Sequence, residues 1–317
     1  MQVAIIDLGT NTFNLLVAKL TDENSFEVIF QDKLSVKLGE GGINTNTILP
    51  IPFQRGISAF EQHLKSAKKF NSQKILAFGT SALRSSLNGN DFVHEIKRQF
   101  NIEINVIDGN EEAELIYEGV RMALHMYDSN SLIMDIGGGS TEFIIANKNT
   151  LVWKQSFDLG AARLLEKFNP SEPITQHQIA ELENYFDKQL VTLDKAIQQF
   201  SIAELIGSSG SFDTFAEIIN CRLNLPIDWD KESSYEYRLN DYYALHEQLL
   251  KSTKEQRLAT PGLIEMRVDM IVVSTIFTNY ILKKYSLQQM RLSTYALKEG
   301  VISKLMKDQE YQVALKK

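Results

Sequence analysis

The sequence predicts an α/β protein built from two domains of the same topology. Two segments carry this prediction, Asp7-Leu8-Gly9-Thr10-Asn11-Thr12 and Asp135-Ile136-Gly137-Gly138-Gly139-Ser140-Thr141, which are built alike and lie about one domain length apart. Each segment follows one apolar run and precedes two more, at 3–6, 13–18 and 26–30 in the first case and at 132–134, 143–146 and 151–157 in the second. Apolar runs broken by Gly and Ser or Thr indicate strands joined by tight turns. The chain therefore repeats a strand–turn–strand–strand unit.

The remainder of the first half alternates helices and strands. Residues 39–52 are rich in Gly, Asn, Thr and Pro, which indicates a loop, and a helix at 58–70 follows because Phe60, Leu64 and Ala67 share one helical face. Further strands are expected at 74–78 and 102–107, and further helices at 91–100 and 111–126. A three-strand meander followed by this alternation predicts a mixed sheet. We place the first domain at 1–120 and the second at 121–317.

The second half repeats the meander and then becomes mostly helical. A long amphipathic helix is expected at 175–200, opened by a capping box of Thr175 and Gln178. A short strand at 205–206 leads into a further Gly/Ser turn, and helices fill most of 212–283. The last strand is expected at 290–293 and a closing helix at 297–306. Cys221 lies in a helical stretch and is expected to be a buried, inert thiol.

Composition excludes several classes of protein. Hydrophobic residues make up 44% of the chain and charged residues 23%, as in soluble globular proteins. The net charge of −7 argues against a nucleic-acid partner, which would require a basic surface. The single cysteine rules out an intramolecular disulfide. No apolar stretch reaches the roughly 18 residues of a membrane span, and no signal peptide precedes the first strand. We therefore expect a cytoplasmic enzyme with no membrane partner.

The two turns have the chemistry of an anion site. Backbone N–H groups in turns of Gly, Ser, Thr and Asn are open to a ligand, and hydroxyls and amides add donors. The residues concerned are Gly9, Thr10, Asn11 and Thr12, and Gly137, Gly138, Gly139, Ser140 and Thr141. A carboxylate beside a phosphate cradle favours a divalent cation, which indicates Asp7, Asp135 and also Glu142 across the second turn. The alternatives are ordinary hairpin turns and an outward-facing Glu142.

Three further segments have side chains suited to phosphate chemistry. Ser81 and Arg84 follow a strand and would offer a hydroxyl and a forked guanidinium, although a helix N-cap with a solvated Arg is the alternative. The pair Glu111-Glu112 opens a helix, where acids are favoured by the helix dipole, or where one of them serves as a general base. The third Gly/Ser turn consists of Gly207, Ser208, Ser209 and Gly210.

Taken in order along nearly the whole chain, these segments resemble the exopolyphosphatase and guanosine pentaphosphate phosphatase family. That family belongs to the superfamily of sugar and acetate kinases, actin and heat-shock chaperones. The matching segments are Asp7 to Thr12, Thr80-Ser81-Ala82-Leu83-Arg84, Asp108 to Ala113 with Tyr117, Gly119 and Val120, Asp135 to Glu142, Leu159-Gly160-Ala161-Ala162-Arg163, Gly207 to Gly210, and Pro261-Gly262-Leu263 with Arg267 and Asp269.

The resemblance implies two duplicated ribonuclease-H-like domains, an actin-like ATPase fold, with the active site in the cleft between them. It implies Mg²⁺-dependent hydrolysis of a terminal phosphoanhydride, and polyphosphate is the leading candidate substrate. By position, the turns at Gly9–Thr12, Gly137–Thr141 and Gly207–Gly210 would bind phosphate with Ser81 and Arg84. Asp7, Asp135 and Glu142 would bind Mg²⁺. Glu112 would activate water, with Arg84 beside it, and Glu111 is the alternative base.

Several alternatives stay open at this point. Guanosine pentaphosphate is the alternative candidate substrate, and a homodimer would fit the family. A kinase-like or actin-like ATPase and a non-catalytic nucleotide or phosphate sensor are the other functional classes. Thr10 and Thr12 stand where the family often has Ser, which keeps the hydroxyls, whereas Ser293 to Gly300 departs from the family pattern. The chain also lacks the C-terminal helical domains of longer members, which favours a short polyphosphate or a nucleotide.

Overall fold

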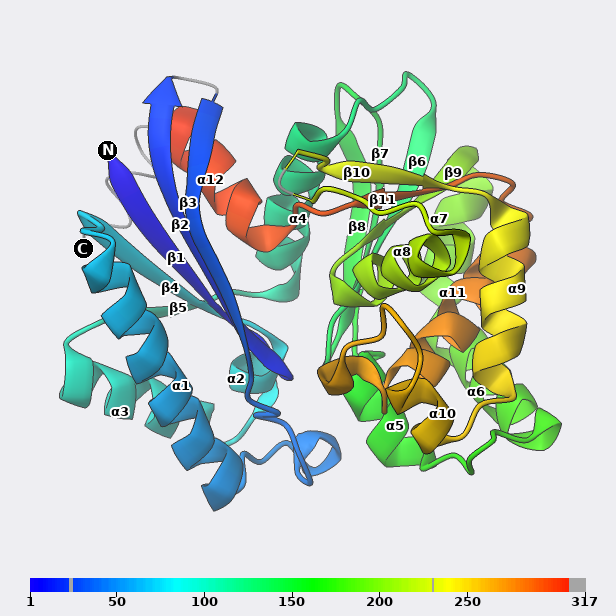
Figure 1. Cartoon of the computed structure of the whole chain (residues 1–317), viewed down its shortest axis with the longest axis horizontal. Coiled ribbons are helices and arrows are strands. Elements are labelled where there is room, and N and C mark those ends of the chain that lie inside the picture. The colour runs from blue at the N-terminus through cyan, green and yellow to red at the C-terminus, as the bar shows by residue number, and fades with distance from the viewer. Residues whose placement is uncertain (23–24, 230, 308–317) are drawn as a thin grey trace.

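The computed structural model describes residues 1–22, 25–229 and 231–307. The first sheet has the strand order β3-β2-β1-β4-β5 and the second the order β10-β11-β9-β6-β7-β8 (Figure 1). The first sheet consists of β1 (Gln2–Leu8), β2 (Thr12–Asp22), β3 (Ser25–Ser35), β4 (Lys74–Gly79) and β5 (Ile104–Val106). The second consists of β6 (Asn130–Ile136), β7 (Thr141–Ala146), β8 (Leu151–Phe157), β9 (Ile202–Ser208), β10 (Ser234–Tyr237) and β11 (Met290–Ser293).

The two sheets share one topology. In each, three antiparallel strands form a meander, and the first of them also pairs in parallel with a later strand, β1 with β4 and β6 with β9. A further parallel strand follows on the same side, β5 in the first sheet and β11 in the second. This is the ribonuclease-H-like arrangement, and the second sheet extends it by β10, antiparallel to β11. The predicted duplication and fold class are confirmed.

The helices separate into layers around the sheets (Figure 1). The first half contains α1 (Pro50–Lys69), α2 (Ser81–Ser85), α3 (Gly89–Phe100), α4 (Gly109–Ala123) and the short η1 (Ile43–Thr45). The second half contains α5 (Ala161–Phe168), α6 (Gln176–Gln189), α7 (Val191–Gln199), α8 (Gly210–Leu223), α9 (Leu239–Leu250), α10 (Lys254–Leu258), η2 (Glu265–Arg267), α11 (Ile271–Lys284) and α12 (Leu297–Lys307).

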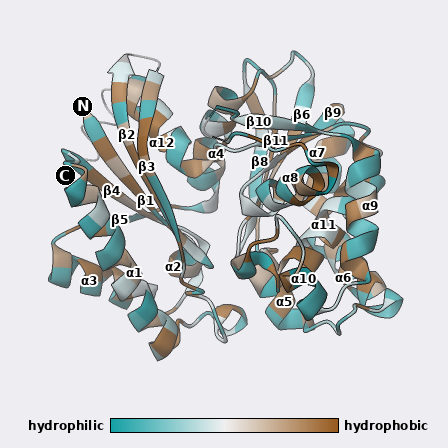
Figure 2. Cartoon of the chain, in the orientation of Figure 1, coloured by the Kyte–Doolittle hydropathy of each residue, from teal (hydrophilic) through white to brown (hydrophobic). Residues whose placement is uncertain are grey.

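Successive side chains of a strand point to opposite faces of the sheet, and each face packs on its own set of helices. In β1, Ala4 and Ile6 pack with α1 and α3 in one apolar cluster, whereas Ile5 points to the opposite face. That opposite face packs on α4 and α12, which also contact the facing side of the second sheet through residues such as Ile133. On the other side of the second sheet, the apolar cluster includes residues of α5, α6, α7, α8, α9 and α11. Figure 2 shows brown apolar stretches along the strands and on the helix faces turned toward them.

The helix α4 ends at Ala123, next to the predicted domain boundary near residue 120, and it packs along α12 between the two sheets. The C-terminal helix therefore lies beside the first sheet although it follows the second in sequence (Figure 1). The boundary itself stays a prediction.

Four local expectations need correction. The helix expected at 175–200 is two helices, because Leu190 leaves helical geometry with φ −93° and ψ 16°, which lets α6 and α7 each turn apolar residues to the core. Its capping box of Thr175 and Gln178 is confirmed. Helix α1 begins at Pro50, inside the expected loop, since proline is favoured in the first helical turn. The expected strand at 205–206 is the longer β9. Cys221 is exposed near the end of α8 and not buried.

Candidate active site

The first turn directs its carbonyl groups away from the cleft between the sheets. The N–H of Gly9 donates to the Thr12 carbonyl at 3.0 Å, which closes the turn between β1 and β2. The Thr10 carbonyl accepts from Gly39 N at 3.2 Å, and the Asn11 carbonyl accepts from Lys37 N at 2.8 Å. A C=O and the N–H of the following residue point in opposite directions, so the Asn11 N–H faces the cleft.

The second turn repeats this geometry against the start of α5. Gly137 N donates to the Ser140 carbonyl at 3.0 Å, the counterpart of the bond between Gly9 and Thr12. The carbonyls of Gly137 and Gly138 accept from the N–H groups of Ala161 and Ala162, both at 2.9 Å. Within the described residues, the N–H groups of Gly138 and Gly139 have no hydrogen-bond partner. They are turned to the cleft and are free to bind an anion.

The close approach of α5 to this turn depends on Gly160. A Cβ atom on Gly160 would lie 2.4 Å from the backbone of Gly138 and Gly139, so no larger residue fits without moving the turn. The N-terminus of α5 thereby binds the carbonyl groups of the turn, and the N–H groups on the opposite side stay open to a ligand.

The two turns face each other from opposite sides of a cavity of about 610 Å³. A Cβ on Gly139 would lie 2.6 Å from both Thr10 Oγ1 and Ser81 Oγ, so these hydroxyls are aimed at the glycine turn. Thr10 Oγ1, Ser81 Oγ and Asn11 Nδ2 are buried and have no hydrogen-bond partner in the described part of the chain. Buried donors without partners are costly, and two of these, Thr10 Oγ1 and Ser81 Oγ, meet at Gly139 of the second turn. An anion at this point would satisfy them.

Three carboxylates, Asp7, Glu112 and Asp135, line the same cavity, and a fourth, Glu142, is the cross-strand neighbour of Asp135 without lining it. Asp7 is the next-to-last residue of β1 and Asp135 lies on β6. Glu142 lies opposite Asp135 on β7, and Glu112 comes from the first turn of α4. All four are buried or nearly so, and burial raises the pKa of each of them. For Asp135, burial and the neighbouring Glu142 raise the pKa to about 7. Neighbouring carboxylates that are both desolvated favour a bound proton or a bound cation.

Glu112 is held by Arg84. Arg84 Nη1 lies 2.8 Å from Glu112 Oε2 and also donates to the Ile107 carbonyl at 3.1 Å. Burial and the charge of Glu142 raise the pKa of Glu112 well above its ordinary value, while Arg84 opposes that shift. Glu112 lines the cavity, whereas Glu111 does not and its N–H is engaged by the Asp108 cap at 2.9 Å. The geometry places Glu112 and not its neighbour at the cavity wall.

A metal site of Asp7, Asp135 and Glu142 is not present as a ready cluster. The described residues contain no group of three or more acidic, histidine or cysteine side chains that could hold a metal ion in this conformation. The donor set still fits Mg²⁺, which is commonly bound by one or two carboxylates together with substrate phosphates. Asp135 and Glu142 are such a pair, and Asp7 is tied to Asn14 Nδ2 at 2.9 Å.

Residues 16–309 match the Ppx/GppA phosphatase family. The chain belongs to the Ppx/GppA phosphatase family. It is therefore a hydrolase, and the resemblance drawn from its motifs is confirmed.

Relatives of this phosphatase carry two kinds of name. A Haemophilus influenzae protein with the provisional name exopolyphosphatase is 31% identical over 99% of this chain and 93% of its own length. A Pseudoalteromonas atlantica guanosine-5'-triphosphate,3'-diphosphate pyrophosphatase is 25% identical over 97% of this chain and 59% of its own. The crystal structure of an exopolyphosphatase from Cytophaga hutchinsonii is 40% identical over 96% of this chain and 98% of that chain, with a TM-score of 0.94.

Some expected site residues lie outside the cavity of this Ppx/GppA phosphatase. The Thr141 hydroxyl donates to the Leu159 carbonyl at 2.9 Å, so it stabilises the turn from behind. A Cβ on Gly207 would strike the Phe212 ring at 2.0 Å, which shows that Gly207 serves packing. The cavity is lined instead by Ser209 and Gly210 from that turn. The residues expected at the site that do not line the cavity are Arg84, Thr141, Glu142, Gly207 and Ser208.

A basic group on the cavity wall was missed by the sequence prediction. Lys33 on β3, Arg267 in η2 and Lys298 on α12 line the cavity around Asp213 of α8. Asp213 Oδ1 and Arg267 Nε are buried without a hydrogen-bond partner among the described residues. Burial and the positive charges of Arg267 and Lys298 lower the pKa of Lys33 to about 8. These residues come from four distant segments, and only Arg267 belonged to a motif.

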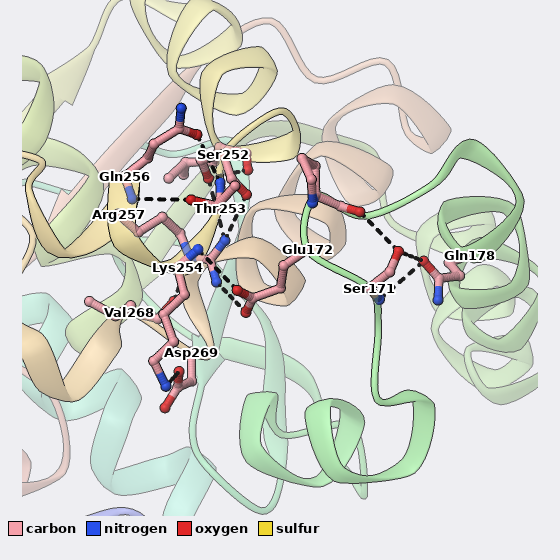
Figure 3. A network of polar contacts seen from close by, with 12 residues as sticks. Ser171, Glu172, Gln178, Ser252, Thr253, Lys254, Gln256, Arg257, Val268 and Asp269 are labelled. Carbon is pink, nitrogen blue, oxygen red and sulfur yellow. Dashed lines mark hydrogen bonds and ion pairs between the residues drawn. The ribbon is translucent and has the colours of Figure 1, made fainter.

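The segment that carries Arg267 is anchored by a polar network (Figure 3). Arg257 is buried, and its Nε donates to the Val268 carbonyl at 2.8 Å while Nη2 pairs with Glu172 at 2.7 Å. Lys254 pairs with Asp269 at 2.7 Å. Bonds on the two residues after Arg267 hold it against the start of α8, where a Cβ on Gly210 would lie 1.9 Å from Arg267 Nη2.

None of the helices in the described part of the chain has the length and hydrophobicity of a membrane span.

Proposed function

We propose that this phosphatase hydrolyses the terminal phosphoanhydride of inorganic polyphosphate with Mg²⁺ and releases orthophosphate. The position of Glu112 carries the proposal, because this buried carboxylate with a raised pKa lies on the cavity wall beside the two open turns. A raised pKa makes this carboxylate a stronger base than an ordinary exposed glutamate, which suits it to accept a proton from water.

In the proposed reaction, the water oxygen attacks the terminal phosphorus while the proton of the water passes to the Glu112 carboxylate. The bond from that phosphorus to the bridging oxygen breaks, and the oxygen leaves with the shortened chain. The Gly138 and Gly139 N–H groups and the Thr10 and Ser81 hydroxyls are placed to hold the terminal phosphoryl oxygens. Phosphoryl transfer requires mainly positioning and charge neutralisation, which these donors supply.

Asp135 and Glu142, with Asp7 close by, would hold Mg²⁺. The chemistry that Mg²⁺ would supply there is neutralisation of the phosphate charge. Burial that raises the pKa of Asp135 to about 7 supports this assignment, since a cation relieves the same repulsion as a proton.

The basic group of Lys33, Arg267 and Lys298 supports a polyanionic substrate. These three cations line the same cavity as the two glycine turns and contribute positive charge to its wall. A chain of phosphates that begins at the glycine turns would have cations within the same cavity to balance its charge.

Guanosine pentaphosphate is the second candidate substrate. It is favoured by Trp229 and Tyr295, two aromatic side chains on the cavity wall on which a base could stack. Removal of the 5′-terminal phosphate from this nucleotide would use the same turns and the same Glu112.

The deciding experiment measures phosphate release with Mg²⁺ from polyphosphate, guanosine pentaphosphate and ATP in parallel, for the wild type and Glu112→Gln. Release from one substrate that the variant loses supports both the base and that substrate. Release from ATP alone, stimulated by an acceptor, would instead indicate a kinase-like enzyme. Binding without release from any of the three would contradict the proposal and favour the sensor. The cytoplasmic location and the homodimer stay predictions.

A further inference from the structure

Arg163 is a buried cation on α5 that bonds to both halves of the molecule. It is 8% exposed, its Nε donates to the Gly139 carbonyl at 2.9 Å, and its Nη1 donates to the Ile43 carbonyl at 2.8 Å. Gly139 belongs to the second phosphate turn, and Ile43 belongs to the segment that follows β3 of the first sheet. One planar guanidinium therefore joins a phosphate turn of one sheet to a loop of the other.

The same loop also holds the first phosphate turn. Between β3 and Ile43, the N–H of Lys37 donates to Asn11 and the N–H of Gly39 donates to Thr10. The connection runs from the Thr10-Asn11 turn through residues 36–43 to Arg163 and on to Gly139. Both phosphate turns are thus supported from behind by one continuous series of hydrogen bonds.

The turn at Gly139 requires such support. Glycine has wide conformational freedom, so the orientation of its peptide groups depends on what their carbonyls bind. The carbonyls of Gly137 and Gly138 are held by backbone N–H groups of α5, whereas in the described structure the Gly139 carbonyl is held by Arg163 Nε. The peptide beyond Gly139 carries the N–H of Ser140, whose direction follows from that carbonyl.

We propose that Arg163 is a positioning residue for the reaction assigned above, on which this inference rests. It orients the Gly139–Ser140 peptide toward the terminal phosphate and fixes that turn relative to the Thr10-Asn11 turn. The guanidinium is needed for its geometry. Its two donors lie in one rigid plane and reach two carbonyls of fixed spacing, which a lysine ammonium on a flexible stem cannot reproduce.

Glu166 offers a matched control, because it joins the same two segments without touching a phosphate turn. Its carboxylate accepts from Gly41 N at 2.9 Å and lies 3.4 Å from Asn44 Nδ2. Glu166→Gln weakens the contact between α5 and the loop but leaves the Gly139 carbonyl bonded. A role in holding the two halves together would make both positions equally important, whereas a role in turn geometry singles out Arg163.

The test compares Arg163→Lys, Arg163→Gln and Glu166→Gln with the wild type in steady-state hydrolysis. Misplacement by about 1 Å commonly costs about 100-fold in rate, so kcat should fall about 10- to 100-fold in both Arg163 variants, with KM changed less. Glu166→Gln should stay within about threefold in kcat. Wild-type kcat in Arg163→Lys, which keeps the charge, would overturn the proposal, and so would an equal fall in Glu166→Gln.

Hydrogen–deuterium exchange supplies a readout that does not depend on catalysis. Exchange at residues 137–140 should rise in Arg163→Lys and stay unchanged in Glu166→Gln, while residues 36–44 exchange faster in both. Unchanged exchange at 137–140 in Arg163→Lys would overturn the proposal. If the wild type hydrolyses none of the substrates, the function assigned above fails, and exchange still decides on Arg163. If Arg163→Gln does not fold, the lysine variant decides alone.

Discussion

Asp135 and Glu142 lie directly opposite each other across the β6–β7 ladder, in the register that Asp7 and Asn14 occupy across β1–β2. In the first sheet the partner of the aspartate is an amide that donates to it at 2.9 Å. In the second sheet the partner is another carboxylate, which raises the pKa of Asp135. The two copies of the strand unit therefore differ at this pair. The first copy has an aspartate with an amide that donates to it, whereas the second has two carboxylates, which require a bound cation or proton.

Replacing Glu142 by Gln should weaken Mg²⁺ binding, because it removes one of the two adjacent carboxylates. We expect the Mg²⁺ concentration for half-maximal activity to rise at least about 10- to 100-fold, since the loss of a mere hydrogen-bond partner of a metal ligand typically costs that much in affinity. Titration of phosphate release with Mg²⁺ measures it. Ser156→Ala is the comparison, since the Ser156 hydroxyl donates to Glu142 at 2.7 Å and its loss leaves the charge in place, so the Mg²⁺ requirement should rise less than in Glu142→Gln. An unchanged Mg²⁺ requirement in Glu142→Gln would refute the assignment.

The raised pKa of Asp135 predicts how stability depends on pH. The folded pKa is about 7 against an ordinary value of 3.8, so the folded protein holds a proton that the unfolded chain has released in this window. This contribution is fully present below about pH 3.8 and is lost as the pH rises through 7. Without Mg²⁺, Asp135→Asn should therefore be more stable than the wild type at pH 8 by about 1–3 kcal/mol, with a smaller difference near pH 4.

Thermal unfolding at pH 4, 6 and 8 in EDTA measures this difference. Asp91→Asn, at an exposed position in the first turn of α3, serves as the control for the same substitution made outside the cavity. A wild type that gains stability relative to Asp135→Asn between pH 4 and pH 8 would contradict the predicted sign.

Gly160→Ala should distort the second phosphate turn. Its Cβ would lie 2.4 Å from the Gly138 and Gly139 backbone, which cannot move aside as a flexible side chain can. We expect a loss of about 1–3 kcal/mol in unfolding free energy, typical of overpacking, and a fall in kcat. Ala162→Gly is the control, because it lowers helix stability by roughly 1 kcal/mol without a clash. Chemical denaturation and kcat are measured together; normal kcat in Gly160→Ala would show that the turn adapts.

Local sequence patterns were sufficient to predict the meanders, their turns and most element types. Strand alternation and Gly/Ser turns act over a few residues, and the pairing of Asp135 with Glu142 follows from one hairpin. The break at Leu190 was not predictable in this way, because the apolar stripe continues through it and only tertiary packing separates α6 from α7. The exposure of Cys221 likewise depends on which face of α8 meets the core.

The residues of the candidate site likewise fall into those that a local sequence pattern predicts and those that only the tertiary structure brings together. The donors of the two glycine turns were predicted because each turn is one continuous segment. Lys33, Asp213 and Lys298 were missed because nothing in the sequence indicates that β3, α8 and α12 meet at one cavity. Arg163 belonged to a recognised motif, but its bonds to Gly139 and Ile43 emerge only when the two halves are placed together.

Arg84 should set the pH range in which Glu112 works. Its guanidinium, 2.8 Å from Glu112, favours the charged carboxylate and so opposes the rise of the Glu112 pKa caused by burial and Glu142. In Arg84→Gln the Glu112 pKa should rise further, and the acidic limb of the pH–kcat profile should move to higher pH. The plateau should fall by about 10²–10³-fold, the range for loss of one charged group that positions and stabilises the reaction.

Arg84→Lys is the informative companion to Arg84→Gln, because it keeps a positive charge near Glu112. The acidic limb should return toward the wild-type position in Arg84→Lys, while the plateau recovers only in part, since an ammonium cannot bond Glu112 and the Ile107 carbonyl with the same geometry. The pH profiles of kcat for the three proteins decide between the possible roles of Arg84. An unshifted limb in Arg84→Gln would mean that Glu112 is not the group whose ionisation limits the reaction.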